Sequence, residues 1–266
     1  LSDEIGKQRD VRDRENVVGP RAVAVPGALA GWCEALARFG TLPLAEVLQP
    51  AIALAERGFT VTPYLSNCIA DNIADLARDP GLAALFLRDG QALPAGTRLV
   101  QSDYAKSLSL IAETGPAALY GGPLGKALTD WISANGGLIG QDDLAAYRVE
   151  TRQPIRGHYR GHEILGPPPP ASSGVHIAQM LNILEGYDIG ALGFGSPDAI
   201  HLLAEALKIA FADRAVATAD PAFVKVPVAR LIDKAYADER RALIAMDEAK
   251  AWSAGLAPGE SNDTTH

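Results

Sequence analysis

The chain has 266 residues, of which 48% are hydrophobic and 21% are charged, and its formal net charge is −8. This composition is typical of one large or two small folded domains and excludes wholesale disorder. An acidic surface repels phosphate backbones, so the charge argues against a nucleic-acid-binding protein. No uninterrupted apolar run reaches the roughly 18 residues that suggest a membrane span.

Two features bear on the cellular compartment. Only two cysteines, Cys33 and Cys68, are present. They are too few for a disulfide framework and have no metal-ligand pattern around them, so we interpret both as small buried thiols. The chain begins at Leu1 rather than Met and shows no signal-peptide pattern. We therefore expect a processed or truncated piece whose start does not reveal its compartment.

After a charged arm, the first half of the chain is predicted to be helical. Residues 1–21 carry dense charges of both signs with little apolar spacing, which indicates a solvated or frayed arm. Pro50 interrupts a helical pattern. Because proline is tolerated in a first turn, we expect a second helix to begin there and to end in a left-handed cap at Gly58. Apolar periodicity predicts helices over 28–39, 44–49, 50–57, 64–78, 103–113 and 123–135.

The second half of the chain contains the clearest strands. Residues 151–165 alternate polar and apolar side chains around glycines and predict a hairpin, which the proline run 167–170 ends. Because an isolated hairpin is only marginally stable, it needs a sheet that this chain hardly supplies. Helices are predicted from Ser172 or Ser173 to about Glu185, from Ser196-Pro197 through Phe211, and over 228–234 and 236–246. The positions expected to be buried are Leu48, Ala51, Leu54, Leu203, Leu207 and Phe211.

Two polar clusters suggest binding sites, but each has a simpler structural interpretation. The glycine-rich stretch 186–195 follows a predicted helix rather than a strand, which indicates a connector rather than a phosphate-binding loop. His201 and Glu205 share one face of a predicted helix without an evident third ligand. That arrangement favours a satisfied polar pair over a metal site.

The remaining candidates are nucleophiles. Ser172 and Ser173 lack a Gly-x-Ser-x-Gly elbow, so a helix cap explains them better than catalysis does. The histidines nearest to them in sequence are His158, His162 and His176. In the tail 260–266, Thr264 can act as a nucleophile only if its own α-amine is free to serve as the base. That requires cleavage of the preceding bond. Taken alone, the tail is best interpreted as a frayed terminus.

Several stretches together resemble the large, N-terminal subunit of γ-glutamyl transpeptidases. Each is short, but eight occur in the family's order and cover the chain from about residue 22 to its end. They are Val25–Trp32, Leu42–Phe59, Asp143–Tyr147, Tyr159–Gly161, Pro167–Gly174, Phe211–Arg214, Asp220–Pro227 and Glu260–His266. The chain departs from the family at Pro170-Ala-Ser-Ser-Gly174, where the family usually has a proline, two serines and two glycines.

The resemblance implies an N-terminal nucleophile hydrolase, an α+β fold with a four-layer αββα sandwich. Residues 22–266 would be the predominantly helical large-subunit portion of one domain, which a small subunit from the same precursor completes. The precursor would cleave itself at Asp263–Thr264. The freed Thr264 would attack the γ-carbonyl of glutathione or a related γ-glutamyl compound and pass the acyl group to water or an acceptor amine. The resemblance implies no metal or organic cofactor, and a periplasmic or secreted location.

Some functional residues are not assigned by the resemblance. The oxyanion-stabilising residues would belong to the small subunit. The arginine that grips the substrate carboxylate is not identified among Arg9, Arg12, Arg14 and Arg21, and the spacing suggests that it precedes Leu1. We therefore expect the 266-residue chain alone to be inactive and to self-associate through uncovered apolar surface. Two alternatives stay open: a related amidase or acylase of β-lactam side chains, and a non-catalytic interaction module.

Overall fold

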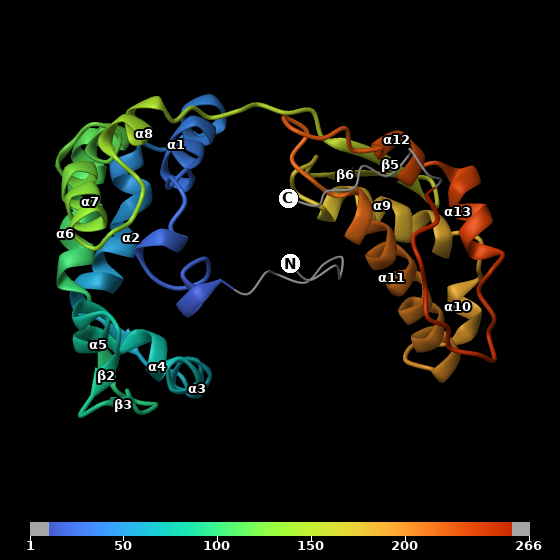
Figure 1. The fold of residues 1–266 in the computed structure, drawn as a ribbon, viewed down its shortest axis with the longest axis horizontal. Helices are drawn as coiled ribbons and strands as arrows, with labels where there is room; N and C mark the ends of the chain where they lie inside the picture. The colour runs from blue at the N-terminus through green and yellow to red at the C-terminus, as the bar shows by residue number, and fades with distance from the viewer. Residues whose placement is uncertain (1–10, 257–266) are drawn as a thin grey trace. The chain divides into compact units, whose positions relative to one another are not determined.

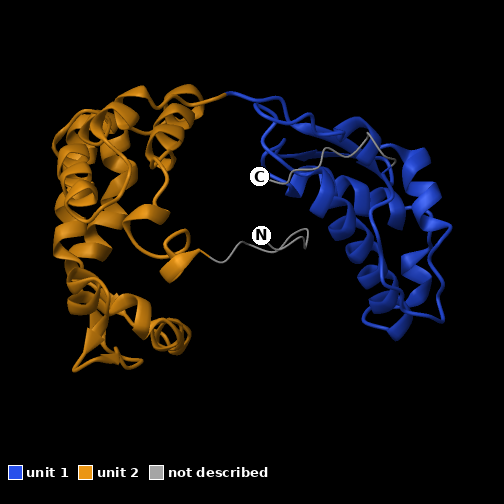
Figure 2. Cartoon of the chain, in the orientation of Figure 1, with its two compact units in different colours: residues 1–9, 151–266 blue, residues 10–150 orange. Residues whose placement is uncertain are grey.

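The computed structural model describes residues 11–256, and these fall into two compact units (Figure 2). The N-terminal unit comprises residues 11–150 and the C-terminal unit residues 151–256. None of the helices in the described residues is long and apolar enough to cross a membrane. The predicted arm at 1–21 and the single domain over 22–266 stay predictions.

Helices form most of the N-terminal unit (Figure 1). They are α1 Ala28–Phe39, α2 Leu44–Arg57, α3 Pro63–Asp71, α4 Ile73–Leu76, α5 Pro80–Phe86, α6 Ser102–Thr114, α7 Pro123–Ala134 and α8 Gln141–Ala146, with 3₁₀ turns η1 Arg12–Arg14, η2 Pro20–Ala22 and η3 Gly115–Ala118. Short antiparallel strands pair β1 Phe59–Thr60 with β4 Arg98–Leu99 and β2 Leu87–Arg88 with β3 Gln91–Ala92. The core consists of small apolar clusters, one around Ile69 and Leu99 and another around Ile132 and Leu144.

The prediction that Pro50 separates two helices is wrong, because α2 continues through it. Pro50 lies on the exposed side of the helix, whereas Ile52 and Ala55 are buried. A proline inside a helix costs about 3 kcal/mol through a lost hydrogen bond and a steric clash. The extensive packing of α2 against α6 offsets that cost. Gly58 after the helix has φ 74° and ψ 167°, so it has the positive φ of the predicted cap but not the left-handed helical conformation.

The single helix predicted over 64–78 is two helices, α3 and α4, in the structure. Asn72 separates them with φ −117° and ψ 14°, and its Nδ2 donates to the carbonyl oxygen of Cys68 at 2.8 Å. A short amide side chain that bonds the local backbone competes with a continuous helix. Both Cys33 and Cys68 are free and only partly buried.

The C-terminal unit packs a hairpin and helices around one central helix. Its elements are β5 Ile155–Tyr159, β6 His162–Gly166, α9 Ser173–Leu184, α10 Ile189–Leu192, α11 Pro197–Ala217, α12 Val228–Leu231 and α13 Lys234–Arg241. The predicted hairpin is confirmed: β5 and β6 are antiparallel, with Tyr159 opposite His162. Arg160 and Gly161 between them both have positive φ, as a tight two-residue turn requires. α9 contacts both strands as well as α11 and α13, and Figure 1 shows the hairpin and α11 on different sides of it.

The start of α9 differs from the prediction. Ser172 already has helical torsion angles, φ −81° and ψ −21°, and its side chain makes no capping hydrogen bond. Two glycines meet here instead. A Cβ on Gly174 would lie 2.2 Å from the carbonyl oxygen of Pro167, and one on Gly166 would lie 2.5 Å from the Cα of Gly174. The end of β6 and the first turn of α9 therefore pack backbone against backbone, which only glycine permits.

α11 begins as predicted, since Ser196 Oγ accepts a hydrogen bond from the Ala199 amide at 3.1 Å. The prediction of its buried face is wrong, because Leu203, Leu207 and Phe211 are 43%, 44% and 55% exposed. Two carboxylates lie on the face that is buried, so apolar periodicity pointed to the other side. The buried residues are Ala199, Leu202, Glu205, Ala206, Ile209, Ala210, Asp213 and Ala217. The positions predicted to be buried in α2 are also not fully buried: Leu48, Ala51 and Leu54.

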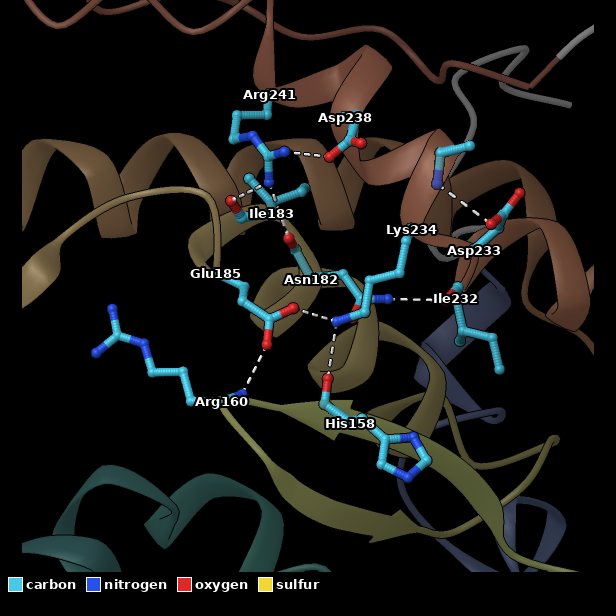
Figure 3. Close-up of polar contacts among 11 residues, drawn as sticks. His158, Arg160, Asn182, Ile183, Glu185, Ile232, Asp233, Lys234, Asp238 and Arg241 are labelled. Atoms are coloured by element: carbon cyan, nitrogen blue, oxygen red, sulfur yellow. Dashed lines mark hydrogen bonds and ion pairs between the residues drawn. The ribbon is translucent and has the colours of Figure 1, made fainter.

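A polar clamp ties the hairpin turn to the end of α9 and the start of α13 (Figure 3). Lys234 Nζ donates to the carbonyl oxygen of His158 at 2.8 Å and to the carboxylate of Glu185. Glu185 also accepts a hydrogen bond from the Arg160 amide at 2.6 Å. The hydrogen bond from Lys234 and then that from Arg160 lower the pKa of the Glu185 carboxyl group. The clamp therefore holds the hairpin against the central helix.

Candidate functional site

The predicted nucleophile Thr264 and the predicted scissile bond Asp263–Thr264 lie outside the described residues. The structure does describe the chain that leads toward them. We call residues 250–256 the approach segment. It follows α13, returns along α11 (Figure 1), and ends among the buried side chains of the C-terminal unit.

Side chains of α11 and α13 hold the approach segment at successive points. Lys208 Nζ donates to the carbonyl oxygen of Lys250 at 2.7 Å. Trp252 Nε1 donates to the buried carboxylate of Glu205 at 2.6 Å. Two further contacts follow along the segment: Arg240 Nη2 donates to the carbonyl oxygen of Ser253 at 2.6 Å, and the Gly255 amide donates to Asp213 Oδ1 at 2.7 Å.

Asp213 is the centre of this arrangement and is fully buried. Its Oδ2 accepts hydrogen bonds from Tyr236 Oη at 2.7 Å and from Gln179 Nε2 at 2.5 Å. Arg240 lies 3.9 Å from its Oδ1, on the side where Gly255 binds. Burial, and then the hydrogen bond to Asp213, raises the pKa of Tyr236, so its hydroxyl stays protonated as a donor. The carboxylate thus joins α9, α11, α13 and the approach segment.

His176 extends the network on the other side of Gln179. Its Nδ1 lies 3.0 Å from Gln179 Oε1 and its Nε2 lies 2.8 Å from Thr218 Oγ1. Burial lowers the pKa of His176, which favours the neutral ring. Since the amide of Gln179 donates to Asp213, its oxygen must accept from Nδ1–H, and Nε2 then accepts from the Thr218 hydroxyl. The histidine is fully used in hydrogen bonding, and it has no hydrogen bond to either serine.

Other sequence candidates have structural roles in the described residues. His201 Nε2 lies 2.8 Å from the Ala245 carbonyl oxygen, and Glu205 binds Trp252 and Lys208, as expected of satisfied polar residues. Nowhere in residues 11–256 do three or more His, Cys, Asp or Glu side chains gather to hold a metal. The hairpin histidines His158 and His162 are exposed. The glycine-rich stretch 186–195 forms α10 and the turns that connect α9 to α11.

The unassigned arginines behave as surface residues where they are described. Arg9 lies outside the described residues. Arg12 pairs with Asp13, Arg14 with Asp75 at 3.0 Å, and Arg21 with Glu15 at 3.3 Å. All of these pairs lie within the N-terminal unit.

Sequence reasoning missed Gln179, Tyr236 and the role of Asp213. Asp213 appeared only as part of the family stretch Phe211–Arg214. One signal could have found it: Asp213 continues the i, i+3, i+4 series that runs through Leu202 and Ala206 to Ile209. A carboxylate at a core position of a helix requires buried partners.

The comparisons with known proteins identify relatives over the whole chain. The sequence profile of the family described as Gamma-glutamyltranspeptidase matches residues 3–266. The Acylase ACY 1 proenzyme of Pseudomonas sp. (strain V22) is 82% identical over 266 residues, which is 100% of this chain and 48% of that protein. The Glutathione hydrolase proenzyme of Escherichia coli (strain K12) is 43% identical, covering 95% of this chain and 44% of that protein. The chain therefore spans about half the length of the curated relatives it matches.

Solved structures agree with the sequence relatives. The gamma-glutamyltranspeptidase of Helicobacter pylori matches with a TM-score of 0.85 and 34% identity, covering 96% of this chain and 72% of that one. The cephalosporin acylase of Bacillus halodurans matches with a TM-score of 0.78 and 31% identity, covering 88% of this chain and 45% of that one. The predicted fold, a mostly helical part of an N-terminal nucleophile hydrolase, is confirmed. The matching family is a family of enzymes.

The prediction of glutathione cleavage and γ-glutamyl transfer is wrong. The relative at 82% identity is an acylase proenzyme, whereas the glutathione hydrolase proenzyme is 43% identical. The stretches that resemble the family gave a wrong prediction of the substrate because some of their residues serve the packing of the interior. Gly174 permits a backbone contact and Asp213 anchors a hydrogen-bond network. Such residues indicate the fold and carry no information about a substrate.

Proposed function

Because the chain belongs to the gamma-glutamyltranspeptidase family, we propose that it is the large-subunit half of an acylase proenzyme. The mature enzyme hydrolyses an amide bond and releases an acyl group. The observation that carries this proposal is the 82% identity to an acylase proenzyme over the full chain. The likeness to a cephalosporin acylase, at 31% identity, supports the acyl side chain of a β-lactam as the substrate class.

The proposed chemistry begins with self-cleavage at Asp263–Thr264. The Thr264 hydroxyl attacks the Asp263 carbonyl carbon, the C–N bond breaks, and water opens the resulting ester to leave a free Thr264 amine. That amine then accepts the hydroxyl proton as Thr264 attacks the substrate amide carbonyl. The proton passes to the leaving amine, and water hydrolyses the acyl ester to regenerate the threonine. Oxyanion donors must stabilise both tetrahedral intermediates, and we assign them to the other half of the proenzyme.

The exposed face of α11 supports a partner from the same precursor. Ile200, Leu203, Leu207 and Phe211 follow one another at three- and four-residue spacings and form one apolar stripe. Each of these side chains is more than two-fifths exposed. A contiguous apolar stripe of this kind marks an interaction surface. We assign its partner to the other half of the proenzyme, the small subunit.

Intact-mass analysis and an acyl-release assay on the full-length precursor test the proposal. The wild type should appear as two fragments that meet at Asp263–Thr264, and Thr264→Ala should stay whole. The cleaved wild type should release the free amine of an N-acyl cephalosporin with a kcat/KM at least about 100-fold above that for a γ-glutamyl anilide, a difference of roughly 2.7 kcal/mol. A polypeptide of residues 1–266 alone should show no release, because its Thr264 nitrogen is an amide and not a base.

Three results would contradict the proposal. A cleaved Thr264→Ala variant would place the nucleophile elsewhere. An uncut wild type that still releases the acyl group would remove self-cleavage from the mechanism. An uncut and inactive wild type would favour a non-catalytic interaction module.

A further inference from the structure

We propose that Asp213 is a positioning residue for self-cleavage. Its buried carboxylate binds the amide of Gly255 and thereby fixes the chain that leads to Thr264. This inference rests on the proposed function, since it concerns the cleavage at Asp263–Thr264. Asp213 does not contact the substrate in this proposal. It acts only through the backbone that it holds.

The first argument is the cost of burying this carboxylate. A fully buried charge is unfavourable unless several donors compensate it. Asp213 has a donor from α9 in Gln179, a donor from α13 in Tyr236, and the Gly255 amide. Gln179 and Tyr236 bind one carboxylate oxygen and Gly255 binds the other. The approach segment is therefore part of the network that makes the buried charge tolerable.

The second argument is the closeness of the contact. A Cβ on Gly255 would lie 2.7 Å from Tyr236 Oη and 2.7 Å from Arg240 Nη1. The backbone at Gly255 thus lies directly on the side chains of α13, closer than any other residue type allows. Trp252 bound to Glu205 and Ser253 bound to Arg240 set the direction in which the segment arrives.

The third argument is the demand of the reaction. The nine residues 255–263 can span at most about 30 Å when extended, so Gly255 limits where Asp263 can lie. Even if the chain were released from Gly255 back to Lys250, past the contacts of Ser253 and Trp252, the probability that the cleavage site reaches a given position would change only about twofold by chain statistics. A misplacement of about 1 Å, in contrast, can slow an intramolecular step about 100-fold. If the rate of self-cleavage falls by much more than twofold, the cause is therefore a changed orientation of the scissile bond and not the longer free chain before it.

Cleavage itself separates this role from a structural one. Before cleavage, Gly255 and Thr264 are in one chain, and the position of one constrains the other. After cleavage, they belong to different chains, and the tether no longer acts on Thr264. A positioning residue for cleavage should therefore affect the rate of self-cleavage but not the activity of molecules that have been cleaved.

The central variant is Asp213→Asn in the full-length precursor. An asparagine has one acceptor oxygen and one donor nitrogen, so it cannot accept from Gly255 on one side and from Gln179 and Tyr236 on the other. We expect the first-order rate of self-cleavage to fall at least tenfold. Cleaved Asp213→Asn molecules, isolated after long incubation, should have kcat/KM within twofold of the wild type.

Two control variants keep the test specific. Asn182→Ala removes a buried hydrogen bond to the Ile232 carbonyl oxygen in the same unit without touching the approach segment, and it should cleave within twofold of the wild-type rate. Tyr236→Phe removes one donor to Asp213 but leaves the Gly255 contact, so it should slow cleavage far less than Asp213→Asn does. Both are measured at a temperature at which circular dichroism shows every variant folded.

A register variant tests the proposal even if Asp213→Asn fails to fold. One glycine inserted between Pro258 and Gly259 leaves every described contact intact but moves Thr264 along the chain. We expect at least a tenfold slower cleavage with an unchanged melting temperature.

Three outcomes overturn the inference while the proposed function stands. Asp213→Asn or the insertion variant could cleave itself at the wild-type rate. Alternatively, Tyr236→Phe could slow self-cleavage as much as Asp213→Asn does. A tenfold loss of activity in cleaved Asp213→Asn molecules would also overturn it, since that would show a structural role. An uncut wild-type precursor fails the proposed function itself, and the inference with it.

Discussion

The two units of the chain have different interiors. Within the described residues, all but one of the buried polar or charged side chains belong to the C-terminal unit. The exception, Thr129 in the N-terminal unit, donates to the Gly125 carbonyl oxygen of its own helix at 3.0 Å. In the C-terminal unit, Asp213 is satisfied instead by donors from three other segments. A polar interior of this kind stabilises one arrangement of its elements and penalises others, whereas apolar clusters tolerate small shifts.

The largest expected effect that tests this difference is on stability. Asp213→Ala leaves two buried donors and the Gly255 amide without an acceptor, and Arg240 without its nearby charge. It should therefore lower the free energy of unfolding of the C-terminal unit by about 3–5 kcal/mol. Thr129→Val removes a hydrogen bond that lies within one helix, and it should cost the N-terminal unit less than about 1 kcal/mol. Hydrogen exchange resolved by segment, with α9 and α7 as reporters in the uncleaved Thr264→Ala precursor, measures both. Equal costs would mean that the two interiors do not differ.

A second prediction compares the two faces of α11. Leu202 is fully buried, so Leu202→Ala should cost about 2–5 kcal/mol. Leu207 is 44% exposed, so Leu207→Ala should cost less than about 1 kcal/mol in the polypeptide of residues 1–266. Urea unfolding midpoints of the two variants give the difference. In the full-length precursor the cost of Leu207→Ala should rise if the other half covers this stripe. An unchanged cost there would show that α11 faces solvent.

The smallest expected effect is a pH dependence confined to one unit. All five histidines of the chain follow residue 150. Burial lowers the pKa of His176 below the ordinary value of about 6.5, so the unfolded chain binds more protons than the folded chain. The stability of the C-terminal unit should therefore fall as the pH drops below about 6.5, and level off below the lowered pKa.

Segment-resolved hydrogen exchange between pH 7 and pH 5 checks this dependence. His176→Gln should flatten it, whereas His162→Gln, at an exposed position of β6, should not. An N-terminal unit that loses as much stability as the C-terminal unit over this range would contradict the assignment to His176.

Local sequence patterns predicted the elements whose signals are local. The hairpin at β5 and β6, the bounds of α1 and the Ser196 cap of α11 agree with the structure, because alternation, helical periodicity and capping act over a few residues. Local rules failed where packing decided. α2 runs through Pro50 because α6 packs along it, and Ser172 is no cap because Gly166 and Gly174 set the turn.

The sequence by itself determined the family, because short stretches in a fixed order carry that information. It also supports Thr264 as the nucleophile, which stays a prediction. It did not determine the acyl group, since the resembling stretches include interior residues that serve the fold. Only the tertiary structure decided which face of α11 is buried and that Asp213 binds Gly255. The physical reason is that a buried carboxylate is stable only with donors from other elements, and those donors are distant in sequence.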